Sequence, residues 1–582
     1  MTGENRNLLL AVLLSAIVLF GWTFVAETWL APPPAAVVAS APAAPGATVG
    51  DVPVGAVTGA VPVGAVTGVV PVGAPTGAVP VAAAIASAPR IAIDTPRLKG
   101  SINLAGARID DLVLRDHRVS IAADSSPIRL FAPSGAKDSW FAGFGWAGAG
   151  APPADAVWTA TGGSLTPERP VTLRWVSPEK LVFEQTIAVD QNFVFTITKK
   201  VTNGSAAAVT LRPFGYINRT GRGPDPNSFN LHVGPIAVLN GTLKEGEIDF
   251  DVLRDDGPQT FTSPGGWLGI TDKHWFAALI PDQKQTIEAR FTAADGDRYQ
   301  TDYLSPAIAV AVGASVTDVS HLFAGAKEVA VVNAVRDDLG APLFDRAIAW
   351  GWFWFIAQPI YNLLGWLYDR VGNYALAIVC LTLIVRIVLY PIANRQYASM
   401  AKMKIFAPKM KEIQEKYKDD KAKQQFALME LYKAEKINPL AGCLPILLQI
   451  PIFYALYKTL LISTEIRHQP GFLWIKDLAA PDPLTPVNLF GLLPFDPPAV
   501  IALGILPIIL GITMFIQFRL NPQPLDEIQQ KVFAWMPWLF MFMMAPFAAG
   551  LQLYWIVNNL VSILQQWVLL RKYPAPAPAP AK

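Results

Sequence analysis

A run of 22 residues, Gly372–Ala393, is long enough to span a bilayer and contains a single charge, Arg386. A charge near the centre of a spanning helix costs about 2.5–3.5 kcal/mol, so it normally faces a bundle interior, a wet cavity or a partner. Thr382, Arg386 and Tyr390 are spaced i, i+4 and i+8 and share one helix face. The alternative is a side chain that only snorkels to the interface, but the first flanking charge, Arg395, is nine residues away.

The composition indicates a membrane protein with a substantial polar part. Of the 582 residues, 52% are hydrophobic and 16% are charged. Both cysteines, Cys380 and Cys443, lie in apolar segments, so no disulfide framework is available to the polar part. No phosphate-binding loop, metal-binding spacing or serine-hydrolase elbow occurs in the sequence. We therefore expect no cofactor and no enzymatic activity.

The N-terminal part reads as a membrane anchor followed by a tether. Leu8–Ala26 are 19 residues without a charge, too long for most signal-peptide cores, so we predict an uncleaved anchor over 1–30. Residues 31–89 are mostly Ala, Pro, Val and Gly and contain a nine-residue repeat, VPVGAVTGA. Such a segment cannot build a core and predicts an extended linker.

The pattern changes to an apolar–polar alternation from about residue 90. Val171, Leu173 and Trp175, for example, alternate with polar neighbours. This period of two predicts a β-rich domain, a sandwich, over 90–345. Its histidines are scattered without metal-binding spacing, so we assign them structural roles.

Three further apolar stretches follow the Arg386 span, namely Leu440–Tyr457, Ala499–Phe518 and Val532–Leu570. The last has 39 residues without a charge, twice the length of one span. The Pro and Gly of Pro546–Gly550, near its centre, suit a tight turn between two spans. Together with the N-terminal anchor, the sequence predicts six transmembrane helices.

The lysines and arginines orient these spans. Residues 395–438 hold eleven basic residues against six acidic ones, which places this loop in the cytoplasm and predicts a basic helical hairpin. Both termini are then cytoplasmic and the β domain lies outside. Eight aromatic residues at 350–368 predict an interfacial helix at the start of a membrane core over 346–573. A disordered tail over 574–582 follows.

The predicted spans contain no Asp or Glu, which argues against an ion-coupled transporter. Arg386 lies about 3.5 residues past the midpoint of its span, toward the cytoplasm, so a pocket around it should open inward. Uncharged polar residues of the spans suit such a hydrated pocket, although each is also compatible with an interhelical hydrogen bond. They include Thr382, Gln449, Gln517, Tyr554 and Asn558. Methionines would add a deformable apolar wall, a hydrophobic slide made of Met514, Met536 and Met541.

The basic loop itself is a candidate docking arm. Lys409, Lys411 and Lys416 lie in it at positions compatible with an exposed helix face. Their functional interpretation is contact with an acidic partner or with anionic lipid, and the alternative is a solvated face.

Several sequence strings resemble one known family, the bacterial membrane insertases of the YidC/Oxa/Alb family in their long form with a periplasmic domain. The strings are GSINLAGARIDDLVL (100–114), GGWLGITDKHWFAALIP (265–281), FDRAIAWGWFWF (344–355), QYASMAKMK (396–404), LYKAEKINPLAGCLPILLQIPIFYALY (431–457), GITMFIQ (511–517) and GLQLYWIVNNLVSILQQ (550–566). Their number and order are specific, and they leave out only the linker and the tail.

The resemblance implies an α+β membrane protein of the inner membrane. Its periplasmic β-supersandwich is joined to a polytopic α-helical core of five spans, with the N-terminal span as an extra anchor. It also implies a membrane groove, open to cytoplasm and lipid, whose positive charge is Arg386 and to which Thr382 belongs. Tyr554 and Trp555 fall where the family has a Tyr-Tyr pair, so Trp555 departs from the pattern.

The function implied is insertion and folding of nascent membrane proteins, alone or with the Sec translocon, without a nucleotide. The implied partners are nascent chains, the Sec translocon, the ribosome and targeting factors, and lipids, with no direct nucleic-acid specificity. An alternative is a non-inserting scaffold or assembly chaperone of the Sec translocon. A third class is a sugar-binding or carbohydrate-modifying periplasmic domain. The sequence shows no paired carboxylates that would support it.

Overall fold

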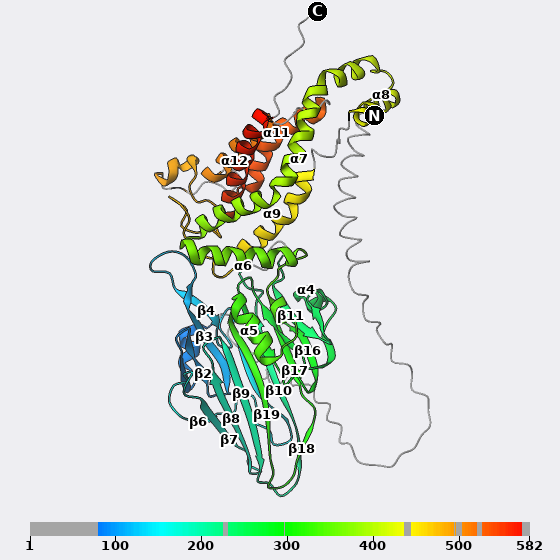
Figure 1. The fold of residues 1–582 in the computed structure, drawn as a ribbon. Helices are drawn as coiled ribbons and strands as arrows, with labels where there is room; N and C mark the ends of the chain where they lie inside the picture. Colours follow the sequence, from blue (N-terminus) through cyan, green and yellow to red (C-terminus); the bar gives the residue numbers. More distant parts are fainter. Residues whose placement is uncertain are drawn as a thin grey trace, which may run out of the picture. The chain divides into compact units, whose positions relative to one another are not determined.

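The computed structural model describes residues 79–224, 231–295, 297–435, 444–493, 495, 503–520 and 527–572, in which a β-rich region is followed by a helical one (Figure 1). The predicted anchor 1–30, the predicted tail 574–582 and the linker up to residue 78 lie outside these residues. The end of the linker differs from the extended tether we expected. Residues Val81–Ala86 form a short helix, α3, because their alanine-rich sequence favours helix.

Two antiparallel sheets make up the β-rich region. Among the described residues, the first sheet has the order β1 (Arg90–Asp94), β2 (Leu98–Asn103), β3 (Arg108–Arg118), β5 (Trp140–Gly148), β10 (Val209–Thr220), β17 (Arg298–Leu304), β16 (Thr286–Ala294) and β13 (Gln259–Pro264), while β4 (Pro127–Phe131) pairs with β3 and β18 (Ile308–Val310) with β10. The second has the order β12 (Thr242–Lys244), β11 (Gly234–Leu239), β14 (Trp267–Thr271), β15 (Trp275–Ile280), β19 (Ser315–Ala326), β9 (Val194–Asn203), β8 (Leu181–Val189), β7 (Val171–Val176) and β6 (Thr159–Thr161).

The alternation seen in the sequence explains the core between the sheets. On β8, every second side chain from Leu181 to Val189 is buried. Val171 and Leu173 of β7 are buried in the same way. Apolar side chains from both sheets belong to one continuous core. The prediction of a β-rich domain is therefore confirmed.

Short helices complete this region. They are η2 (Gly246–Ile248), α4 (Phe250–Asp255), α5 (Val329–Leu339) and η3 (Phe344–Ala347). The Phe344 ring of η3 packs on Trp267 and Phe276, with centroid distances of 5.2 and 5.6 Å. The chain thus still contributes to the β core close to residue 345, where we predicted the domain boundary.

Helix α6 (Trp354–Val371) is the amphipathic helix that the aromatic cluster predicted. One face is buried through Ala357, Ile360, Leu364 and Leu367. Trp354, Phe355 and Trp366 are exposed, as expected for side chains at headgroup depth. The helix ends at Gly372, whose φ of +69° is a left-handed conformation that glycine adopts without strain.

Helix α7 (Tyr374–Lys416) begins directly afterwards, and the side chain of Asn373 caps it by accepting from the Leu376 N–H at 3.1 Å. It is continuous over 43 residues and contains Pro391 and Pro408. The predicted span and the first half of the basic loop are therefore one helix. Its segment Tyr374–Asn394 is, within the described ranges, the one helix long and apolar enough to cross a membrane.

The remaining elements are α8 (Lys421–Ala434), α9 (Leu444–Ile462), η5 (Pro486–Gly491), α10 (Ile505–Leu520), α11 (Glu527–Met544) and α12 (Ala549–Lys572). The break between α11 and α12 falls at the predicted turn, Pro546–Gly550. Helix α12 packs against both α7 and α10, and α6 packs against α7 and α9. The full count of six transmembrane helices stays a prediction.

Candidate functional site

Polar side chains of α12 connect this helix to four others. Gln552 bonds to the end of α11, Tyr554 to α9, Asn558 to α7 and Asn559 to α10. Each of these four side chains is at most 3% exposed. Hydrogen bonds between apolar helices are worth about 0.6 kcal/mol on average, so together they fix the arrangement more than any one of them does. Helix α12 thus makes polar contacts with four of the described helices.

Arg386 points from α7 toward α12. Its Nε donates to the Asn558 Oδ1 at 2.7 Å, and its Nη2 donates to the Asn558 backbone oxygen at 3.2 Å. Arg386 is partly buried, whereas its neighbours Ile387 and Val388 are 72% and 70% exposed. The apolar side of α7 is therefore open while its arginine lies against a polar partner, as expected for a charge facing a bundle interior.

A second polar contact lies one turn earlier on α12. The Gln449 Nε2 of α9 donates to the Tyr554 hydroxyl at 2.5 Å. Tyr554 is fully buried, whereas Gln449 is partly exposed. The structure thus brings four predicted groove residues to α12 or its immediate partners, in two pairs: Arg386 with Asn558, and Gln449 with Tyr554.

Thr382 and Trp555 take structural positions. Thr382 is fully buried, and its hydroxyl donates to the Ile378 carbonyl of its own helix at 2.7 Å. Trp555 packs between Phe453 of α9 and Phe540 of α11, with centroid distances of 5.5 and 5.1 Å. The indole N–H of Trp555 is buried and has no acceptor among the described residues. A groove role for either residue stays a prediction.

The side chains predicted for a hydrophobic slide are mostly inside the bundle. Met514 and Met541 are buried, and Met536 is partly buried. Gly511 of α10 allows Met541 of α11 to pack closely against it, because a Cβ at position 511 would lie 3.2 Å from both the Cβ and the Sδ of Met541. On the same two helices, the most exposed large apolar side chains are Trp535 and Leu539 of α11. Gln517 of α10 is partly buried.

The predicted docking lysines lie on the last part of α7. Lys409, Lys411 and Lys416 are all exposed. Helix α8 follows after a short turn, capped by Asp420, which accepts from the Lys423 N–H at 3.1 Å. The Gln424 side chain donates to the Gln414 carbonyl of α7.

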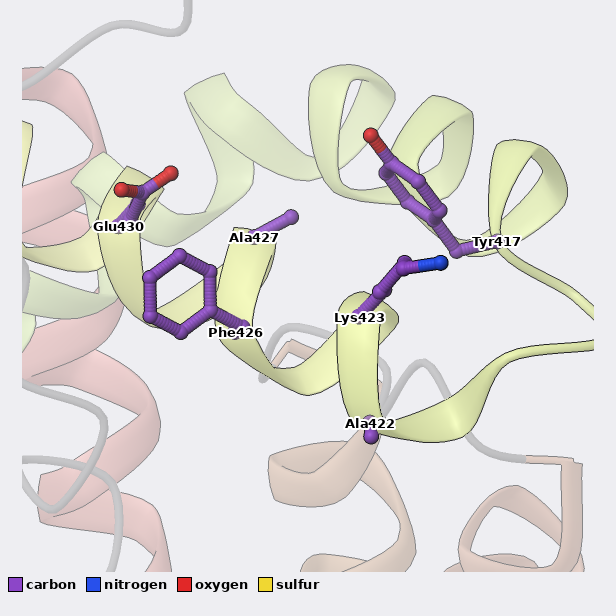
Figure 2. Close-up of a pocket in the computed structure, with 6 residues that line it drawn as sticks. All are labelled: Tyr417, Ala422, Lys423, Phe426, Ala427 and Glu430. Atoms are coloured by element: carbon purple, nitrogen blue, oxygen red, sulfur yellow. The ribbon is translucent and has the colours of Figure 1, made fainter.

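A hollow of about 470 Å³ opens beside this turn. It is lined by Tyr417, Ala422, Lys423, Phe426, Ala427 and Glu430, and none of the three docking lysines contributes to it. Figure 2 shows Tyr417 and Lys423 together at one end and Phe426 and Glu430 at the other.

The segment between α9 and α10 holds the starts of α10 and α12 together, a feature that we did not predict. Asp482 accepts from the Leu506 N–H of α10 at 2.7 Å and from the Trp474 indole N–H at 2.9 Å. Two carbonyls close by, those of Ala480 and Leu478, accept from the first two N–H groups of α12. Backbone and carboxylate contacts thereby tie this segment to α10 and α12, at the opposite end of α12 from its basic C-terminus.

Two family models match the chain. Residues 90–363 match the YidC periplasmic domain, and residues 366–576 match the 60Kd inner membrane protein. A membrane protein insertase YidC from Zymomonas mobilis is 42% identical over 584 residues, which cover 98% of this chain and 96% of that protein. A second, from Methylorubrum extorquens, is 44% identical over 590 residues with the same coverage. The chain belongs to the YidC family of membrane protein insertases.

The YidC family membership confirms the resemblance drawn from the sequence strings. A solved structure, described as an active YidC insertase with the first transmembrane domain resolved, is 18% identical with a TM-score of 0.37, covering 82% of this chain and 92% of that one. The β-rich region corresponds to the YidC periplasmic domain, and the helical region to the inner membrane protein. Neither match assigns a role to any single side chain.

Proposed function

We propose that this chain inserts nascent membrane proteins into the bacterial inner membrane through a hydrophilic groove around Arg386. The observation that carries the proposal is the Arg386 side chain, the single charge of the Gly372–Ala393 span, which bonds to Asn558 of α12. A cation held inside a membrane span lowers the free energy of a polar or acidic chain segment that enters the membrane. The family membership supports the same activity.

The proposed topology has six spans, cytoplasmic termini and a periplasmic β domain. Its support is the excess of basic residues in 395–438 and the basic pair Arg571 and Lys572 after the last span. In this orientation, the contacts of Asp482 close the groove on the periplasmic side and the α7–α8 hairpin lies in the cytoplasm. The groove then opens inward, toward the ribosome side.

The proposed mechanism uses no nucleotide. The hydrophilic end of a client enters the groove beside Arg386, while the client's apolar segment leaves along the lipid-exposed sides of the spans. Partitioning of that segment into hydrocarbon, up to about 0.6 kcal/mol for each Leu or Ile at mid-helix, drives release. Exposed side chains such as Trp535 and Leu539 offer a better exit surface than the buried Met514 and Met541.

The proposed partners are nascent membrane proteins, the ribosome with its targeting factors, the Sec translocon and surrounding lipid. The exposed Lys409, Lys411 and Lys416 support an electrostatic contact on the cytoplasmic side. A contact with the Sec translocon would allow the same core to work alone or as part of a larger assembly.

The test compares two matched clients in cells that carry only one variant of the protein. One client has Asp and Glu in its translocated tail, and the other has none. We expect Arg386→Ala to abolish insertion of the acidic-tail client and to preserve much of the insertion of the neutral-tail client, because the cation is gone. Arg386→Lys should retain much activity on both, since Lys keeps the charge but not the guanidinium fork.

Protease protection of the tails gives the readout, and Arg370→Ala, an exposed cation of α6, is the matched control. Equal loss of both clients in Arg386→Ala would leave hydration, rather than charge, as the role of this residue. Full insertion of both clients in Arg386→Ala would reject the groove and favour a non-inserting scaffold.

A further inference from the structure

Two adjacent asparagines of α12 face two different helices. Asn558 accepts from Arg386 of α7, and Asn559 donates to the Thr513 hydroxyl of α10 at 3.2 Å. Successive residues of a helix point about 100° apart, so one step along α12 is enough to change the helix that is contacted. The two side chains share their chemistry and their burial, but only one of them touches the charge.

The contact between Asn558 and Arg386 fixes the guanidinium at two points. The side-chain oxygen takes the Nε at 2.7 Å and the backbone oxygen takes the Nη2 at 3.2 Å. Asn558 is 3% exposed, and its backbone oxygen also accepts from the Ser562 hydroxyl at 2.7 Å. A buried acceptor on a packed helix has little freedom, so it determines where the arginine points.

Both acceptors that Asn558 offers are uncharged. An aspartate at the same position would have nearly the same shape and could accept the same Nε hydrogen bond. It would also place a negative charge about 3 Å from the guanidinium, where opposite charges attract strongly in a low-dielectric surrounding. The orientation of Arg386 would survive this change, but its attraction for another anion would not.

We propose that Asn558 is a positioning residue that holds Arg386 toward the client path through neutral acceptors and thereby sets a preference for clients with acidic tails. The inference rests on the function proposed above. Asn558 acts here through Arg386, and the client meets the charge of the arginine rather than the amide.

The experiment uses the purified full-length chain in liposomes and the same two clients, one with an acidic tail and one with a neutral tail. The variant Asn558→Asp replaces the amide NH2 by a second carboxylate oxygen, so it adds a negative charge while the shape of the side chain stays nearly the same. We expect it to lower insertion of the acidic-tail client by about tenfold, the effect of about 1.4 kcal/mol, and to change the neutral-tail client by less than about twofold. The ratio of the two insertion yields is the readout, because loss of packing alone would lower both yields.

The matched control is Asn559→Ala, which removes a buried asparagine and its bond to Thr513 but not the partner of the arginine. It should leave the ratio of the two clients unchanged. A second variant, Asn558→Ala, keeps the cation and the backbone acceptor while removing the side-chain acceptor. We expect it to lower the ratio by about threefold, since one charge-assisted hydrogen bond no longer orients the guanidinium.

An unchanged ratio in both Asn558→Asp and Asn558→Ala would overturn the inference, as would an equal loss of both clients in a folded Asn558→Asp protein. If Asn558→Asp does not fold, the ratio in Asn558→Ala decides. The result for Arg386→Ala separates failure of the positioning role of Asn558 from failure of the proposed groove. A selective defect there with normal Asn558 variants would reject only the positioning role, whereas wild-type activity of Arg386→Ala would reject the groove together with it.

Discussion

The hydroxyl of Tyr361, in α6, donates a hydrogen bond of 2.7 Å to the carboxylate of Glu465, 104 residues further along the chain. The other carboxylate oxygen accepts from Ser463 at 2.8 Å and from Thr464 at 3.2 Å. Burial and the nearby Glu465 charge raise the pKa of Tyr361, so this hydroxyl remains a donor in mildly alkaline solution. Helix α6 is thereby fastened to the segment that follows α9.

The first prediction is that Tyr361→Phe destabilises the protein by about 1.5–3 kcal/mol, the usual range for a hydrogen bond to a charged group. Thermal unfolding of the full chain in detergent measures this. Tyr368→Phe is the matched control, because the Tyr368 ring stacks on Tyr374 at 3.9 Å and no hydrogen bond of its hydroxyl is found among the described residues. Equal unfolding temperatures for the two variants would show that the Glu465 contact contributes nothing.

The second prediction concerns Lys327, directly after β19. Burial lowers its pKa to about 7, although Asp272 and Glu245 act in the opposite direction. Between about pH 7 and pH 10.5 the unfolded chain binds a proton that the folded chain does not, so the free energy of unfolding should rise with pH in this window. Below pH 7 both states hold the proton and this contribution stays at its lowest.

Replacing Lys327 by Met should therefore stabilise the protein at pH 7 and make its free energy of unfolding depend less on pH between pH 7 and about pH 9.5. In the wild type we expect an increase of up to about 3 kcal/mol from pH 7 to about pH 9.5, since each unit of pKa difference corresponds to about 1.4 kcal/mol. Thermal unfolding of the full chain at the two pH values measures it, with Lys284→Met, an exposed lysine, as control. A wild type and a Lys327→Met variant with the same pH dependence would contradict the prediction.

The third prediction concerns Gln552, near the start of α12. Its amide nitrogen donates to the carbonyls of Met544 at 2.9 Å and Phe547 at 2.8 Å, which belong to the end of α11 and the turn after it. Gln552→Leu keeps the volume but removes the donor, and an unsatisfied buried acceptor costs about 1–3 kcal/mol. Asn559→Ala, which removes one interhelical bond, should cost only about 0.6 kcal/mol. Unfolding in a graded series of denaturing detergent orders the two variants, and the reverse order would disprove this account of the turn.

The sequence pattern was sufficient wherever one element determines the outcome. Alternation predicted the β-rich domain, and a Pro–Gly segment inside an apolar run predicted the break between α11 and α12. Helical spacing predicted that Arg386 would turn toward polar surroundings. Each of these depends on which residues share one face of one element, and periodicity contains that information.

What the pattern could not supply is the partner of each face. Asn558, an acceptor of Arg386, lies 172 residues away from it, and the donor to Tyr554 lies 105 residues away. Methionine spacing likewise could not tell a lipid-facing wall from the contact at Gly511, where two helices come close together and bury Met541. Such pairings depend on the crossing of helices that are distant in the sequence, and the spacing within one helix does not specify it.

The last prediction concerns the docking lysines on the final turns of α7. Reversing Lys409, Lys411 and Lys416 to Glu changes the charge by about six units on an exposed surface, so folding should be little affected. Association of the full-length protein with ribosomes should weaken, and the remaining association should depend more steeply on salt, because a favourable electrostatic contact becomes a repulsive one. Sedimentation with ribosomes at low and physiological salt gives the measurement.

The charge-matched control is the variant with Lys284, Lys180 and Lys137, three exposed lysines of the β-rich region, reversed to Glu. It should bind ribosomes as the wild type does. If the α7 variant also binds ribosomes like the wild type at physiological salt, the docking role of these lysines is rejected. The lysines then form only a solvated face, whose charge orients the spans.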